Sequence, residues 1–292
     1  MPQWERILTH AGSVLGESLQ PGAVRTVGGG CINAAYVVDA GPRSFFIKLN
    51  GAEALAMFEA EAEGLVAIAE SHSIRVPQPL CFGVAGSDAY LVMEYLPLGG
   101  RGKAEQLGED LASMHRCQQP RFGWHRDNTI GSTAQYNDWC EDWLQFWREQ
   151  RLGAQLSLAA HNGAGAKLLR KGEQLQHSLS ALFTDYRPVP SLLHGDLWSG
   201  NYAFDDTGRP VIFDPAVYFG DREADLAMTE LFGGFPAGFY AAYQAAWPLD
   251  AGYGARKTLY NLYHILNHFN LFGGGYLAQA EGLMDRLLSE CR

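Results

Sequence analysis

LLHGDLWSGN, residues 192–201, brings one histidine, one aspartate and one asparagine together in a short polar segment. Asp196 and Asn201 have the separation of the Asp and Asn in the pattern H-R-D-x-x-x-x-N, and Asp214 lies near the end of the apolar stretch PVIFDP, residues 210–215. Phosphoryl transfer needs such a set. One carboxylate accepts the proton of the attacking hydroxyl, while an amide oxygen and a second carboxylate hold Mg²⁺. The spacing therefore predicts a catalytic loop for phosphoryl transfer.

Each of these residues, taken alone, has an ordinary structural explanation. His194 and Asp196 would cap a turn, and Asp214 would begin the next loop. The joint spacing, together with Lys48 upstream in the chain, makes the structural explanation the weaker one.

The composition of the chain excludes several classes of protein. With 22 Lys and Arg against 32 Asp and Glu, the 292 residues carry a formal charge of −10, so we expect neither a nucleic-acid nor a membrane partner. The N-terminal segment lacks the parts of a signal peptide, and no stretch approaches the roughly 18 apolar residues of a membrane span. Five scattered cysteines without a CxxC pair argue against disulfides and zinc, and we expect a cytoplasmic protein.

Residues 1–96 have the pattern of a small sheet lobe. A glycine triplet between two stretches of β-branched and aromatic residues predicts two strands joined by a tight turn. Three more strands follow from apolar stretches that come after turn signals, and one main helix follows from helical spacing. These elements give a five-stranded antiparallel sheet, and a hinge or linker follows at 97–103. The stretches are 24–39 with Gly28, Gly29 and Gly30, then 44–49, 53–70, 80–84 and 89–96.

The order of these elements suits the phosphates of a nucleotide. Backbone N–H groups approach an anion closely only where side chains are absent, as in the glycine triplet. Lys48, in the strand SFFIKL, reaches the α and β phosphates if a helix carboxylate holds it in place. A hairpin and a solvated lysine explain the same residues without a ligand, so the order of the elements carries the prediction.

Residues 104–292 have the pattern of a larger, mostly helical lobe. Aromatic residues recur at helical spacing within 136–152, and such a stripe is more often core than a ligand platform. Helices are predicted at 104–117, 136–152, 163–183, 222–232, 237–247 and 257–272, with a hairpin turn at 205–208. The predicted fold class is therefore α+β with two lobes.

The chain resembles the fructosamine kinase family, also called ketosamine 3-kinases. The resemblance extends from GGGCIN through FFIKLN, FEAEAEGL, LVMEYL and HGDLWSGN to VIFDPAVYFGDREADLAMTELFGGFP and LYHILNHFNLFGG. That family is part of the aminoglycoside phosphotransferase and choline kinase group. The resemblance implies a two-lobed protein-kinase-like fold, with ATP and Mg²⁺ as cofactors.

The resemblance also implies a role for each matching residue. Lys48 would bind the phosphates with Glu61 as its helix partner, and Asp196 would be the catalytic base. Asn201 and Asp214 would hold Mg²⁺. The remaining roles are backbone contacts with adenine by Glu94, Tyr95 and Leu96, and support of the catalytic loop by His194 and Asp225. The chain has Asp-Pro where protein kinases have Asp-Phe-Gly and lacks an APE segment, so no activation-loop switch is expected.

Family members phosphorylate the O3 hydroxyl of a sugar attached to an amine as a ketoamine, which leads to deglycation. The resemblance therefore implies a ketosamine small molecule or a glycated protein amine as the substrate. Acidic residues near the motif, Asp221 among them, would attract its protonated amine, unless they are a solvated acidic face. Trp198 is proposed as a wall for the sugar or its amine substituent, and His268 is a weaker candidate.

Other interpretations stay open at this point. An aminoglycoside or choline phosphotransferase has the same scaffold, and a nucleotide-binding module without transfer activity is a further alternative. The joint presence of Lys48, Asp196 and Asp214 speaks against the inactive module. Cys31, in the glycine segment, is either a redox-sensitive thiol or a small half-buried filler. Both a monomer and a homodimer are compatible with the sequence.

Overall fold

The computed structural model describes residues 2–28 and 32–291. The chain forms two compact units. The N-terminal unit extends to Lys103 and includes Tyr202–Pro215, and the C-terminal unit consists of Ala104–Asn201 and Ala216–Arg292. Within the described ranges, no helix combines the length and the apolar character needed to cross a membrane.

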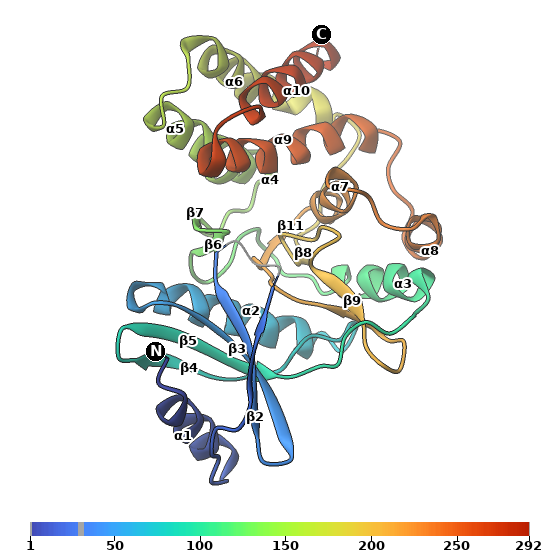
Figure 1. Cartoon of the computed structure of the whole chain (residues 1–292). Helices are drawn as coiled ribbons and strands as arrows, with labels where there is room; N and C mark the ends of the chain where they lie inside the picture. Colours follow the sequence, from blue (N-terminus) through green and yellow to red (C-terminus); the bar gives the residue numbers. More distant parts are fainter. Residues whose placement is uncertain (1, 29–31, 292) are drawn as a thin grey trace. The chain divides into compact units, whose positions relative to one another are not determined.

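A five-stranded antiparallel sheet forms the centre of the N-terminal unit, as predicted (Figure 1). The strand order is β1-β2-β3-β5-β4, so β3 lies in the middle and pairs with both β2 and β5. The strands are β1 (Val24–Val27), β2 (Ala34–Ala40), β3 (Arg43–Gly51), β4 (Pro79–Ala85) and β5 (Asp88–Glu94).

Two helices cover the two faces of this sheet. Side chains alternate along a strand, so Ile47 and Lys48 of β3 point to opposite faces. Ile47 packs in one apolar cluster with Leu8 of α1, whereas Lys48 reaches α2. The helices are α1 (Trp4–Leu15) and α2 (Leu55–Glu70), with a 3-10 turn at Ala52–Ala54. The sequence prediction of one main helix missed α1, which covers the apolar face.

A hairpin from the second half of the chain belongs to the N-terminal unit. Its strands are β9 (Tyr202–Phe204) and β10 (Pro210–Ile212), which pair antiparallel. The N–H of Ile212 donates to the carbonyl of Arg75 at 3.0 Å. The predicted lobe of residues 104–292 includes this hairpin, whereas the structure assigns it to the N-terminal unit.

The glycine-rich segment 97–103 packs against this hairpin. The backbone N–H groups of Gly99 and Gly100 both donate to the carbonyl of Phe204, at 3.0 and 3.1 Å. A Cβ atom at Gly100 would lie 1.8 Å from the carbonyl oxygen of Asp205. Glycine therefore permits a close backbone approach here. The segment predicted as a linker is an ordered part of the N-terminal unit.

The C-terminal unit is mostly helical and has one large apolar core. Its helices are α3 (Ala104–His115), α4 (Trp143–Phe146), α5 (Ala154–His161), α6 (Ala166–Ser178), α7 (Glu223–Leu231), α8 (Ala237–Ala246), α9 (Tyr253–Phe272) and α10 (Tyr276–Glu290). A π-helical segment, Trp147–Gly153, joins α4 to α5, and a 3-10 turn, Leu179–Phe183, follows α6. The short strands are β6 (Asn128–Ile130) with β7 (Thr133–Gln135), and β8 (Ser191–Leu193) with β11 (Tyr218–Gly220).

The helix predicted at 136–152 begins later than expected. The carboxylate of Asp142 accepts the backbone N–H of Gln145 at 2.6 Å and caps a helix that starts at Trp143. Trp143 and Trp147 are buried in the core, as the aromatic stripe predicted, but Trp139 of the same stripe precedes the helix and is 36% exposed. The sequence prediction also missed α10 and the short strand pairs β6–β7 and β8–β11.

Candidate active site

Lys48 contacts two other residues that were predicted to serve the nucleotide and the metal. Its Nζ donates to Oε1 of Glu61 on α2 and to Oδ1 of Asp214 after β10, both at 2.6 Å. Burial opposes the charge of the lysine, which is 5% exposed, but the two carboxylates raise the pKa of Lys48 above its ordinary value. Lys48 is therefore a cation, and all three residues belong to the N-terminal unit.

The two carboxylates at Lys48 differ in their surroundings. Burial raises the pKa of Glu61, and the attraction of Lys48 offsets part of this effect. The Asp214 side chain is 48% exposed and has an oxygen that can meet a ligand. Its φ of +59° is one of two positive values at non-glycine residues of the described chain. Such backbone strain clusters at functional sites.

The predicted adenine contacts lie at the end of β5. Glu94 is the last residue of the strand, its N–H donates to the carbonyl of Gln78 at 2.8 Å, and its carboxylate accepts from Arg75 at 2.8 Å. Tyr95 and Leu96 follow directly.

Part of the predicted phosphate loop can be described. Gly28 is exposed, and a Cβ atom there would meet nothing within 4 Å. The remaining predicted residues of this loop, Gly29 and Gly30, and the candidate thiol Cys31 lie outside the described residues.

Asp196 and Asn201 are joined within the C-terminal unit. Nδ2 of Asn201 donates to the backbone carbonyl of Asp196 at 2.8 Å, and the N–H of Asn201 donates to the carbonyl of Trp198 at 2.9 Å. Because the amide nitrogen of Asn201 is engaged, its Oδ1 is the atom left to bind a cation. The loop thus presents one carboxylate and one amide oxygen from a fixed backbone.

Gly195 allows the chain to turn between His194 and Asp196. Its φ is +83°, and a Cβ atom there would lie 2.1 Å from the carbonyl oxygen of Ala216. The N–H of Ala216 donates to the carbonyl of His194 at 2.8 Å. Both the backbone angle and the contact require glycine at this position.

Asp225 of α7 binds the backbone of the same loop. Its two oxygens accept the N–H groups of His194 and Gly195 at 2.7 and 2.8 Å. Nε2 of His115 lies 3.1 Å from this carboxylate, and Nδ1 of His115 lies 2.8 Å from the hydroxyl of Tyr243. Burial opposes the charge of Asp225, but these contacts lower the pKa of Asp225 below its ordinary value. Sequence reasoning missed His115, which looked like an ordinary residue of the helix α3.

Two predicted substrate residues lie in one series of aromatic rings. The ring centroids of Trp198 and Phe232 are 6.4 Å apart, and those of Phe232 and His268 are 4.8 Å apart. Sequence reasoning missed Phe232, which connects the other two, because the three residues are far apart in the sequence.

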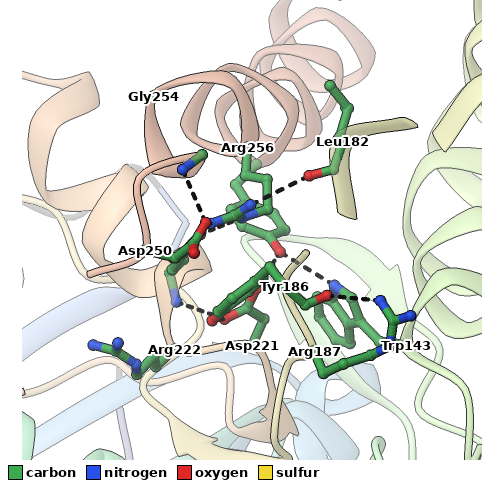
Figure 2. A network of polar contacts seen from close by, with 12 residues as sticks. Trp143, Leu182, Tyr186, Arg187, Asp221, Arg222, Asp250, Gly254 and Arg256 are labelled. Atoms are coloured by element: carbon green, nitrogen blue, oxygen red, sulfur yellow. Dashed lines mark hydrogen bonds and ion pairs between the residues drawn. The ribbon is translucent and has the colours of Figure 1, made fainter. Parts of the chain in front are cut away.

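The third predicted substrate residue, Asp221, requires a correction. It is fully buried, and the hydroxyls of Tyr260 and Tyr186 donate to its carboxylate at 2.5 and 2.8 Å. Figure 2 shows Asp221 beside Tyr186 in this network. The guanidinium of Arg256 lies 3.9 Å from the ring centroid of Tyr186 and donates twice to Glu223. Asp221 is therefore part of a buried network and cannot attract a substrate amine from the surface, so it is left out of the proposed site.

The predicted residues thus fall into two sets, one in each unit. The N-terminal unit holds Lys48, Glu61, Asp214 and the end of β5. The C-terminal unit holds Asp196, Asn201, Trp198 and His268, with His194 and Asp225 as support.

The chain is similar to known proteins over nearly its whole length. A family model described as fructosamine kinase matches residues 3–290. A probable ketoamine kinase of Synechocystis sp. is 47% identical over 98% of this chain and 97% of its own length. A chloroplastic protein-ribulosamine 3-kinase of Arabidopsis thaliana is 46% identical over 98% of this chain and 87% of its own length.

Solved structures with a similar fold are also known. The crystal structure of a putative fructosamine-3-kinase from Haemophilus somnus has a TM-score of 0.89 at 28% identity and covers 98% of this chain and 97% of its own. The aminoglycoside phosphotransferase APH(4)-Ia has a TM-score of 0.62 at 17% identity, over 97% of this chain and 98% of its own, which shows a shared fold alone. The predicted two-lobed α+β, protein-kinase-like fold class is confirmed.

Proposed function

This chain belongs to the fructosamine kinase family, and on that basis we propose that it transfers the γ-phosphoryl group of ATP to the O3 hydroxyl of ketosamines. The observation that carries the proposal is the pairing of Lys48 with both Glu61 and Asp214. A strand lysine held by a helix carboxylate, next to a metal-binding Asp, is the arrangement that protein kinases use for a triphosphate. In the proposed complex Lys48 binds the α and β phosphates and Glu61 orients it.

The nucleotide has further proposed contacts. Backbone groups of Glu94, Tyr95 and Leu96 bind adenine, and backbone N–H groups of the segment that begins at Gly28 bind the phosphates. Glycine at 28 leaves the space around this backbone open.

The proposed metal ligands fit Mg²⁺, which prefers oxygen donors. Asn201 offers its amide oxygen because its amide nitrogen bonds to the Asp196 carbonyl. Asp214 offers a half-exposed carboxylate, one oxygen of which is engaged by Lys48. When bound, Mg²⁺ neutralises negative charge on the transferred phosphoryl group.

In the transfer step, Asp196 accepts the proton of the O3 hydroxyl. The bond between O3 and the γ-phosphorus forms as the bond from that phosphorus to the bridging oxygen breaks, so the electron pair leaves with ADP. Trp198 and His268 form walls of the site that holds the sugar. Nδ1 of His268 donates to the carbonyl of His264 at 2.8 Å, so Nε2 is the ring nitrogen left to contact a hydroxyl of the sugar.

The product explains the purpose of the reaction. A 3-phosphate next to the ketoamine carbonyl is a good leaving group. Its elimination through the enol between C1 and C2 gives inorganic phosphate and an imine of a dicarbonyl sugar, and water then hydrolyses that imine and releases the amine. The relatives named ketoamine kinase and protein-ribulosamine 3-kinase support this acceptor, whereas aminoglycoside phosphotransferases share only the fold. We propose a cytoplasmic location, since five scattered cysteines without a CxxC pair suit a reducing compartment.

An acceptor panel tests the proposal. Ribulosamine, erythrulosamine and fructosamine adducts, choline and an aminoglycoside are each incubated with the protein, ATP and Mg²⁺, and ADP release is measured. We expect turnover of one or more ketosamines and none of the other acceptors. With the best ketosamine, Asp196→Asn should lower kcat by about 10² to 10⁴, as for loss of a general base.

The panel can also reject the proposal. Turnover of choline or the aminoglycoside without any ketosamine would assign a different acceptor. A normal kcat in Asp196→Asn, with an unchanged melting temperature, would place the base elsewhere.

A further inference from the structure

Arg75, in the connection between α2 and β4, contacts two parts of the proposed nucleotide site. Its Nη2 donates to Oε1 of Glu94 at 2.8 Å, and its backbone carbonyl accepts the N–H of Ile212 at 3.0 Å. Glu94 ends β5, where the adenine contacts are proposed, and Ile212 is two residues before Asp214, the proposed metal ligand. All four residues belong to the N-terminal unit. Arg75 therefore links the adenine end of this site to its metal end.

The backbone of Arg75 is held in place by its surroundings. Its neighbours Ile74 and Val76 are buried, at 6% and 1% exposed, and residue 75 forms a parallel bridge with Val211 of β10. Packed regions of a protein leave the chain little freedom to move. The guanidinium therefore extends to Glu94 from a fixed point of the N-terminal unit.

The carboxylate of Glu94 is held at both oxygens, but unequally. Besides the short charged bond from Arg75 to Oε1, the N–H of Gln78 donates to Oε2 at 3.4 Å. The N–H of Glu94 donates to the carbonyl of Gln78 at 2.8 Å, and Tyr95 and Leu96 follow directly. Without the guanidinium, the side chain of Glu94 keeps only the long contact, so the backbone at the end of β5 loses an anchor.

This ion pair is too exposed to contribute much to the fold. The side chains of Arg75 and Glu94 are 32% and 35% exposed, and pairs between exposed groups add little to stability. Its position matters more, because the proposed adenine contacts are backbone groups of residues 94–96. Hydrogen bonds weaken steeply when they are misaligned, so a small shift of this backbone changes how well a base binds.

We propose that Arg75 is a positioning residue which, by holding Glu94, makes the site select adenine over guanine. This inference rests on the adenine contacts of the proposed function. Adenine carries an amino donor at N6, whereas guanine carries a carbonyl acceptor at O6. A backbone carbonyl held in one position therefore accepts from adenine and repels guanine, and a backbone that can move accommodates both bases.

Calorimetry with two matched nucleotides tests the inference. Kd is measured for non-hydrolysable analogues of ATP and GTP, each with Mg²⁺, in wild type, Arg75→Ala, Arg75→Lys, Glu94→Ala and the double alanine variant. As a control, Arg43→Ala removes another arginine of the N-terminal unit, whose 2.9 Å ion pair with Glu17 is also exposed and has no part in the proposed site.

We expect Arg75→Ala to raise Kd for the ATP analogue by about tenfold and Kd for the GTP analogue by less than about threefold, as for loss of one hydrogen bond to the base. Glu94→Ala should have the same effect. The double variant should bind no more weakly than either single variant, because each substitution removes the same pair. Arg75→Lys should restore most of the selectivity, since an ammonium can also pair with Glu94, and Arg43→Ala should leave both Kd values unchanged.

Equal weakening of both analogues in Arg75→Ala, or an unchanged ratio of the two Kd values, would overturn the inference. So would a wild-type protein that binds the two analogues equally well. If Arg75→Ala lowers Tm strongly, the ratio is read from Glu94→Ala, which leaves the backbone contacts of Arg75 in place. No sugar acceptor enters this experiment, so a protein that selects adenine in this way but phosphorylates no ketosamine would refute the proposed acceptor and support the role of Arg75.

Discussion

The buried imidazole of His264 gives the stability of the chain a pH dependence. His264 lies in α9, and burial, with a smaller effect of His268, lowers the pKa of His264 from 6.5 to about 3. The unfolded chain binds a proton on this ring near pH 6.5, whereas the folded chain does not, so acid favours the unfolded state. The contribution of His264 to stability is complete above pH 6.5 and is lost as the pH falls toward 3.

His264→Phe tests this effect with an uncharged ring of similar size. Between pH 7 and pH 5, wild type should lose about 2 kcal/mol more of its free energy of unfolding than the variant. Urea unfolding at the two pH values measures the difference. His161→Asn, which changes an exposed histidine, should follow wild type. If His264→Phe shows the same pH slope as wild type, His264 is protonated in the folded chain.

Single residues also show what a sequence can predict about a site. Lys48, Asp196, Asn201 and Asp214 were proposed because their chemistry requires certain residue types at certain spacings. The prediction that Asp221 attracts the substrate amine was wrong. The sequence does not distinguish an aspartate in a buried network from one on an acidic surface. Only the folded structure shows that two tyrosine hydroxyls occupy the carboxylate of Asp221.

Among the elements, the strands of the large sheet and most of the long helices followed from their apolar patterns, but α1, α10 and the connections did not. Stretches of apolar, β-branched and aromatic residues between turn signals predicted the sheet, because such side chains suit a buried strand. The segment 97–103 looked like a linker because glycine is flexible in an unfolded chain. Its actual conformation depends on the β9–β10 hairpin, which is distant in the sequence, and no local pattern predicts that contact.

Gly100→Ala tests whether the segment 97–103 is held by that contact. The added methyl group would lie against the carbonyl oxygen of Asp205, so the backbone must shift. We expect a loss of roughly 1–3 kcal/mol in the free energy of unfolding, as for other overpacked sites. Arg101→Ala, at an exposed neighbour, should change it by less than about 0.5 kcal/mol. Equal effects of the two substitutions in urea unfolding would mean that the segment is a free linker.

For the chain as a whole, the proposed nucleotide site links ligand binding to unfolding. A ligand that binds only the folded chain raises the free energy of unfolding by about 2.7 kcal/mol at 100 times its Kd. For a chain of this size, each kcal/mol corresponds to roughly 2–4 °C in Tm. A non-hydrolysable ATP analogue with Mg²⁺ should therefore raise Tm by several degrees, and EDTA should remove part of the shift.

Lys48→Met tests how much of the Tm shift caused by the ATP analogue depends on the contact of Lys48 with the phosphates. Without the ammonium, Glu61 can take up a proton, since burial already raises the pKa of Glu61, so the variant should still fold. The Tm shift with the ATP analogue and Mg²⁺ should fall to less than about half of the wild-type value, because the phosphates lose their cation. Adenosine, which has no phosphate, should shift Tm equally in both proteins. If the ATP analogue also shifts both proteins equally, Lys48 does not bind the phosphates and its two ion pairs serve the fold alone.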